Sequence, residues 1–245
     1  MIGDITTMMT KEWREFFTSS GSRRSGFIGI LIILVVFGLY LPYRIGQVWV
    51  ETPLSVFFYS VYLPLTLVIS VIADSIAGER ERHTLETLLA SRLSDRAIIL
   101  GKLGAAAGYS LVISTLAALV GMVAANLQGG KSFQLYPIGI LISIIAFALL
   151  VSILFAGIGV LVSLRASTVR QAQQVMSVAM IVVFLLPALI FAALSNAARQ
   201  QFLGWLSSAD WTTIGLIVAA ALVIIDLLVI AVVMARFQRS KLILA

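Results

Sequence analysis

The sequence contains no cysteine and one histidine, and only 11% of its 245 residues are charged. The lack of cysteine excludes disulfides, thiolate metal sites and cysteine nucleophiles. The single histidine, His83, has no second histidine or cysteine with which to hold a metal ion, so we expect no metal site. A soluble domain has roughly 25% charged residues. The shortage of charge therefore argues against a soluble globular protein.

Apolar residues make up 60% of the sequence and are gathered into long uncharged runs. Six such runs occur, at residues 25–43, 52–73, 103–130, 132–164, 171–198 and 211–235, the last interrupted only by Asp226. A helix needs about 20 apolar residues to cross the hydrocarbon core of a bilayer. We therefore expect an all-α integral membrane protein with a single transmembrane domain, residues 1–245. Its six spans are expected near residues 26–43, 54–74, 103–125, 136–164, 174–195 and 212–235.

Lysines and arginines are distributed unevenly between the two sides of this arrangement. Of the 17 basic residues, only Arg44, Lys131 and Arg199 fall on one side, and the other 14 fall on the side that carries both termini. Basic flanks are retained in the cytoplasm. We therefore expect a multi-pass protein of the cell membrane with both termini cytoplasmic. The net charge of +6 is explained by this orientation, and we expect the lipid bilayer rather than nucleic acid as a partner.

Tryptophans and prolines give further expectations. Trp49, Trp205 and Trp211 fall near the outer span ends, where amphipathic rings favour the membrane interface. Pro64 and Pro187 fall inside spans and are expected to kink them.

Residues 1–19 form an amphipathic segment before the first span. Ile5, Met9 and Trp13 recur at helical spacing, opposite Lys11 and Glu12. This pattern predicts a helix that lies in the cytoplasmic interface and connects to the first span. The alternative is that the helix serves only as a lipid anchor.

The connection between spans two and three, residues 74–102, is much longer than a bare turn requires. Leucines recur at helical spacing within it, among charges of both signs: Leu85, Leu88, Leu89 and Leu93. The pattern predicts an amphipathic helix over residues 79–93 on the cytoplasmic face. Its leucine stripe needs a partner, which is the bilayer interface, the inner ends of other spans or another protein. The mixed charges favour a protein, because anionic lipid selects lysine and arginine alone.

This segment resembles the coupling helix in the permeases of ABC type-2 exporters. The matching positions are an acidic pair, a helix core, a serine and a closing glycine-lysine pair: Glu79 and Glu81; Thr84, Leu85, Glu86, Leu88 and Leu89; Ser91; Gly101 and Lys102. The chain departs from the pattern at His83, where glycine is common, and at Arg92, where proline is common. From these departures we expect a slightly longer helix than usual.

The resemblance implies a permease subunit that couples to a separate cytoplasmic ATPase. It implies two ATPase subunits, which bind ATP and Mg, and a second permease protomer, identical or homologous, with no cofactor in this chain. The residues to which it assigns ATPase coupling are Glu79, Arg80, Glu81, Thr84, Leu85, Glu86, Leu88 and Leu89. We expect Leu88 and Leu89 to fill a groove on the ATPase and the two acids of the pair to meet its basic residues.

The chain itself carries no nucleotide-binding motif, and we expect it not to be an enzyme. The nearest approach to a phosphate loop is NLQGGKS at residues 126–132, where the pattern would require glycine at the position of Ala125. No serine has the glycine and base context of an intramembrane hydrolase.

Asp226 is the only acid in the interior of a predicted span. A central acid costs on the order of 3 kcal/mol even on a lenient insertion scale, so Asp226 should face other helices or water. It either lines the transport path, where it would bind a cationic part of the substrate, or makes a structural hydrogen bond. The candidate partners for such a bond are Ser143, Ser152 and Ser177. Small residues such as Gly104 and Gly108 are expected to be helix-packing positions.

Two other functions fit the same hydropathy. One is an ATP-independent channel or secondary transporter that uses Asp226 as a proton or ion site. The other is a membrane assembly or anchoring subunit. Neither explains why a long, charged, leucine-striped helix lies on the cytoplasmic face.

Overall fold

A computed structural model describes residues 2–18, 23–127 and 132–237. In these ranges 89% of the residues are helical and no strand occurs. Within them, six helical stretches are long and apolar enough to cross a membrane: Ile28–Ile45, Pro53–Glu81, Asp95–Leu127, Ile138–Arg165, Val169–Ala193 and Trp211–Arg236. The expected fold class, an all-α integral membrane protein, is confirmed.

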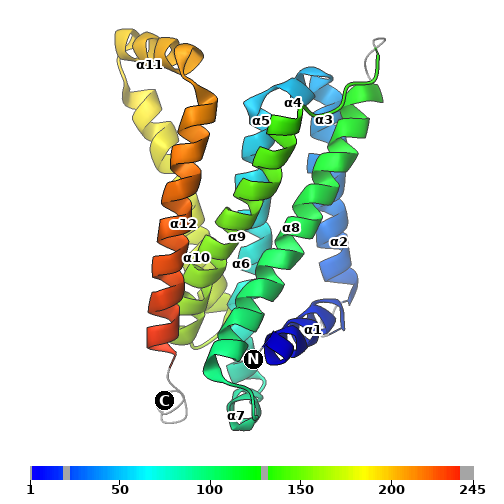
Figure 1. The fold of residues 1–245 in the computed structure, drawn as a ribbon, viewed down its shortest axis with the longest axis vertical. Helices are drawn as coiled ribbons and strands as arrows, with labels where there is room; N and C mark the ends of the chain where they lie inside the picture. The colour runs from blue at the N-terminus through cyan, green and yellow to red at the C-terminus, as the bar shows by residue number, and fades with distance from the viewer. Residues whose placement is uncertain (1, 19–22, 128–131, 238–245) are drawn as a thin grey trace.

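The long helices run side by side in alternating directions (Figure 1). The first two spans are segmented, as α2 (Arg23–Ile33), η1 (Leu34–Tyr40) and α3 (Leu41–Ile45), and as α5 (Pro53–Phe57), η2 (Phe58–Tyr62) and α6 (Leu63–Glu81). The other spans are single helices, α8 (Asp95–Leu127), α9 (Ile138–Arg165), α10 (Val169–Ala193) and α12 (Trp211–Arg236).

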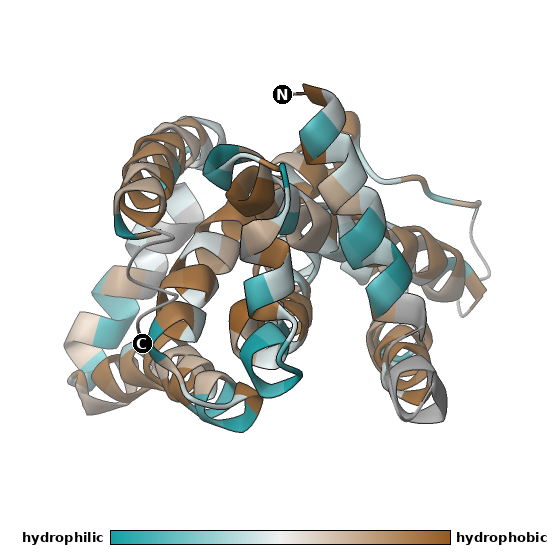
Figure 2. Cartoon of the chain, turned by 90° about the horizontal axis from the view of Figure 1, so that it is seen from below, coloured by the Kyte–Doolittle hydropathy of each residue, from teal (hydrophilic) through white to brown (hydrophobic). Residues whose placement is uncertain are grey.

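Short helices close the two ends of the bundle. At one end lie α4 (Val48–Glu51) and α11 (Asn196–Ser208), and at the other lie α1 (Ile2–Thr18) and α7 (Leu85–Ala90) (Figure 1). We refer to these as the α11 end and the α7 end. The sequence predicted only a connection between the fifth and sixth spans where α11 lies. A view from the α7 end shows hydrophilic residues on α1 and on the connections, around spans that are mainly hydrophobic (Figure 2).

Each of the first two spans contains a π-helical segment that ends two residues before a proline. The segment η1 ends at Tyr40, ahead of Pro42, and η2 ends at Tyr62, ahead of Pro64. Proline lacks an amide hydrogen and its ring crowds the preceding turn, so a wider turn accommodates it. In the fifth span, α10 continues through Pro187 to Ala193.

Two main apolar clusters hold the bundle together. The first surrounds Trp49 and Tyr59, which have 0% exposure. Trp49 was expected at the membrane interface, but its indole N–H donates to the Tyr59 hydroxyl at 3.2 Å inside the bundle. The second cluster extends along α6 to Leu85 of α7. Because α6 packs on α8, α9 and α10, it is the central helix of the α7 end.

The amphipathic helix α1 packs along α8 at the α7 end (Figure 1). Its larger side chains lie against glycines of α8: Met8 on Gly101, Met9 on Gly104 and Trp13 on Gly108. The indole N–H of Trp13 also donates to the carbonyl of Ala105 at 3.2 Å. The structure therefore places α1 in the packed bundle, which is more than a lipid anchor requires. Gly104 and Gly108 are packing positions, as expected.

Candidate functional site at the junction of α6 and α7

The segment predicted as one helix over residues 79–93 is divided in the structure. The second span, α6, ends at Glu81, and α7 covers only Leu85–Ala90. Between them His83 has a φ of 55°, a left-handed conformation that glycine adopts without strain. The expectation that His83 lengthens the coupling helix is therefore wrong. The chain turns at this position in spite of the side chain, and residues 79–81 belong to the second span.

Glu79 is buried at the end of α6, with 2% of the residue exposed. Its Oε1 lies 3.1 Å from Nζ of Lys102 and 2.7 Å from Nζ of Lys11. Lys102 is also buried, contacts the carboxylate of Glu12 at 2.7 Å and donates to the carbonyl of Ser75 at 2.6 Å. These charges join α1, α6 and α8. Glu79 thus pairs with two lysines of its own chain. Its expected contact with a basic residue of an ATPase stays a prediction.

Burial and charge pairing oppose each other in this network. Burial raises the pKa of the Glu12 carboxyl, and the adjacent Lys102 only partly offsets that rise. Burial lowers the pKa of Lys11, but the hydrogen bond and charge of Glu79 outweigh it, so the pKa of Lys11 is raised. Carboxylate oxygens of Glu12, Glu15 and Glu79 lie within 4.8 Å of one another. Because two lysine ammonium groups bind these carboxylates, we interpret the group as an ion-pair network and not as a metal site.

Arg80 and Glu81 attach the end of α6 to the connection between α9 and α10. Arg80 donates to the carbonyls of Ala166 at 2.6 Å and Leu164 at 3.3 Å, where α9 ends. Glu81 accepts from the backbone N–H of Val169 at 2.9 Å, where α10 begins. An acidic side chain at a helix N-terminus satisfies an unpaired N–H and complements the helix dipole. Both side chains thus serve contacts within the chain.

Ser163 of α9 provides a further attachment to α6. Its hydroxyl accepts from the N–H of Ala77 at 2.9 Å and donates to the carbonyl of Ala73 at 3.2 Å. With the contacts of Glu79, Arg80 and Glu81, the end of α6 is bound to α1, α8, α9 and α10.

The helix α7 turns Leu85 and Leu88 toward the bundle. Leu85 is buried, and Leu88 is half-buried against the cluster along α6. The side chain of Leu89 lies outside the described residues. The spacing of residues 85 and 88 puts both on one helix face. Leu88 therefore packs partly on this chain, and its expected insertion into a groove of the ATPase stays a prediction.

The opposite face of α7 is polar and exposed at the extremity of the bundle (Figures 1 and 2). Glu86, Thr87 and Ala90 are exposed there. Thr84, just before α7, donates its hydroxyl to the carbonyl of Glu79 at 3.3 Å and so fixes the start of the helix. Among the members of the predicted coupling set on α7 whose side chains the structure describes, Glu86 is the exposed one.

Asp226 lies on α12, far along the chain from this junction, and is 5% exposed. In the described part of the chain neither of its carboxylate oxygens has a hydrogen-bond partner. Ser152, one expected partner, bonds to Ser110, and Ser143, another, donates to the carbonyl of Gly139 at 2.7 Å. The structural hydrogen bond considered for Asp226 is therefore not formed with either serine.

Sequence reasoning missed Lys11 and Glu12 and did not assign a pairing role to Lys102. One signal was present, because Lys102 stands directly before a long uncharged run. A lysine that enters such a helix bundle needs a carboxylate partner. Which carboxylate it meets depends on how α1 and α6 pack on α8.

These features define a multi-span helical membrane protein with a short surface helix attached to its second span. A family model described as ABC-2 family transporter protein matches residues 45–214, which is more than half of the chain. The chain belongs to this family and is a membrane permease subunit of an ABC transporter. Membership implies an ATPase partner. No curated protein and no solved structure matches the chain significantly.

Proposed function

We propose that this chain is the permease of an ABC exporter and that α7 is the helix through which a cytoplasmic ATPase acts on it. The observation that supports this most directly is the connection between α7 and α6. The short helix is exposed, while the helix that precedes it is bound to four others through Glu79, Arg80, Glu81 and Ser163. The ATPase would bind ATP and Mg, and this chain would bind neither.

The proposed coupling begins at the exposed face of α7. Glu86 and Thr87 would contact the ATPase, while Leu85 keeps α7 attached to the bundle. Closure of two ATPase subunits would then displace α7, and the buried charges around Glu79 would carry the displacement into α1 and α8. The substrate path would lie between this chain and a second permease protomer, identical or homologous.

The proposed orientation places the α7 end in the cytoplasm. It is supported by the 14 of 17 basic residues that the sequence assigns to that side. We place the protein in the cell membrane on the same reasoning.

We also propose a role for Asp226 in the transport path. A buried carboxyl without a hydrogen-bond partner costs stability, and polar residues inside membranes usually serve function. We assign it to a cationic group of the substrate or to a coupled ion.

The exposed face of α7 provides the test of the proposed function. Glu86→Arg reverses one exposed charge without touching the packed leucines, and it should abolish co-purification of the ATPase at an unchanged melting temperature. Gln200→Arg is the matched control, because it adds charge at an exposed position of α11 at the other end of the bundle. Equal ATPase recovery and ATP turnover for both variants would exclude α7 as the docking helix.

A further inference from the structure

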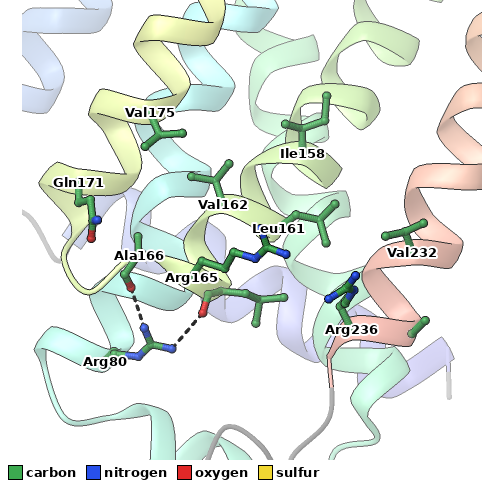
Figure 3. Close-up of a pocket in the computed structure, with 12 residues that line it drawn as sticks. Arg80, Ile158, Leu161, Val162, Arg165, Ala166, Gln171, Val175, Val232 and Arg236 are labelled. Atoms are coloured by element: carbon green, nitrogen blue, oxygen red, sulfur yellow. Dashed lines mark hydrogen bonds between the residues drawn. The ribbon is translucent and has the colours of Figure 1, made fainter. Parts of the chain in front are cut away.

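A groove at the α7 end is lined by α9, α10 and α12 and has a cavity volume of about 640 Å³ (Figure 3). Its lining contains three arginines, Arg80, Arg165 and Arg236, and no acidic residue. The rest of the lining is mainly apolar. The proposed coupling mechanism uses Arg80 of this lining and neither Arg165 nor Arg236.

Two of the arginines converge from different helices. Arg165 ends α9 and Arg236 ends α12, and Figure 3 shows both side chains directed into the same space. In the described part of the chain neither forms an ion pair with an acid. Arg80 adds a third charge, held by its bonds to two carbonyls at the end of α9. Like charges repel one another, and an anion bound among them would offset this repulsion.

Gln171 supplies an oriented neutral donor on the α10 side of the same groove. Its amide oxygen accepts from the backbone N–H of Ser167 at 2.9 Å and from the Ser167 hydroxyl at 3.0 Å. Because a backbone N–H only donates, the oxygen of the amide must face it. The NH₂ group of Gln171 is thereby left as a donor in the groove lining. Donors of this kind suit a phosphate oxygen.

The walls of the groove continue into the apolar surface of the bundle. Ile158 and Leu161 of α9, Val175 of α10 and Val232 of α12 line it. Val175 is 49% exposed and Val232 is 46% exposed, so an apolar ligand can reach the wall from the surrounding membrane. A groove with a cationic end and an apolar wall complements an anionic phospholipid. The phosphate of such a lipid lies at the membrane surface and its acyl chains lie in the hydrocarbon.

We propose that this groove binds an anionic phospholipid of the leaflet that meets the α7 end. The phosphate contacts Arg165 and Arg236, Arg80 and Gln171 add a charge and a donor elsewhere in the lining, and one acyl chain lies along α9 between α10 and α12. Membrane orientation alone accounts for basic residues at the ends of spans. It does not account for two arginines from separate spans that enter one groove without an acid.

The test is native mass spectrometry of the purified full-length chain with added phosphatidylglycerol. Phosphatidylcholine serves as the zwitterionic comparison. We expect selective retention of phosphatidylglycerol, and a loss of at least about tenfold in its affinity for the double variant Arg165→Gln/Arg236→Gln. The matched control is Arg92→Gln/Arg96→Gln, which removes two exposed charges at the same end outside the groove, and it should retain the lipid. Equal losses in both double variants would overturn the proposal, because they would indicate general surface charge.

Two further measurements separate a lipid site from a simple phosphate site. Val232→Trp leaves every arginine in place and fills the apolar part of the groove, so it should also weaken retention of phosphatidylglycerol. Millimolar inorganic phosphate should not displace the lipid. Displacement by phosphate together with normal binding by Val232→Trp would show that the groove takes free phosphate, and the lipid assignment would be wrong.

Discussion

Lys102 of α8 and Glu79 of α6 form a buried ion pair with 3.1 Å between Nζ and Oε1, one turn before the second span gives way to α7. Both residues are almost fully buried. The pair costs desolvation energy, which its other partners, Glu12, Lys11 and the carbonyl of Ser75, help to offset. The pair therefore lies in a charged junction that joins the end of α6, next to α7, to α1 and α8.

Removal of the Lys102 ammonium should be strongly destabilising. In Lys102→Met the carboxylates of Glu12 and Glu79 stay buried without their central partner, which typically costs about 3 to 5 kcal/mol. Lys11→Met is the control, because the Lys11 side chain is 39% exposed and its loss should cost about 1 kcal/mol or less. Unfolding of both variants in detergent measures the difference. Similar unfolding midpoints for the two variants would show that the buried Lys102 contributes no more to stability than the partly exposed Lys11.

Contact between α1 and α8 should depend on Gly101. A Cβ built at this position would lie 2.5 Å from the Cβ of Met8, so Gly101→Ala should separate the helices and destabilise by about 1 to 3 kcal/mol. Gly139 of α9 has no neighbour within 4 Å of such a Cβ. Gly139→Ala should therefore be neutral or stabilise by about 0.5 to 1 kcal/mol. Melting temperatures of the two variants should move in opposite directions, and a parallel change would contradict the packing of α1.

Ionisation of Glu12 should reduce stability as pH rises. Its pKa is raised above the ordinary value of 4.5, mainly by burial, so the folded state binds the proton more tightly than the unfolded state. The contribution of Glu12 is therefore greatest below pH 4.5 and falls as pH increases through the raised pKa. Relative to Glu12→Gln, the natural protein should gain stability as pH is lowered toward 4.5. A pH-independent difference between the two melting curves would refute this assignment.

Asp226 should contribute little to folding and more to transport. No hydrogen bond to Asp226 is found in the described part of the chain, so Asp226→Leu should leave the melting temperature unchanged or raise it. This differs from the loss of about 1 to 2 kcal/mol that an interhelical hydrogen bond would imply. Asp226→Asn should retain ATP hydrolysis with the partner subunit and lose transport. Full transport by Asp226→Asn would remove the residue from the proposed path.

Reporter fusions should establish which end of the bundle is cytoplasmic. The asymmetry of basic residues predicts a cytoplasmic signal after Ala245 and within residues 74–102. Fusions near Gly130 and Asn196 should report the opposite side. A cytoplasmic signal at Gly130 would contradict the proposed orientation.

The sequence by itself determined the number of spans and the amphipathic nature of the first helix. Both properties depend on local hydropathy and helical spacing, which neighbouring residues along the chain decide. The helical spacing of the leucines likewise predicted that Leu85 lies on an apolar face of its helix. Even the packing role of Gly104 followed from residue size alone.

Only the tertiary structure decided which charges are available to a partner and which are used inside the chain. Glu79 and Glu86 look alike in the sequence, yet Glu79 is buried against Lys102 and Glu86 is exposed on α7. Lys102 and Glu12 are 90 residues apart, and no local pattern specifies that separation. Their pairing results from the docking of α1 on the glycines of α8, a contact that exists only after the spans have packed.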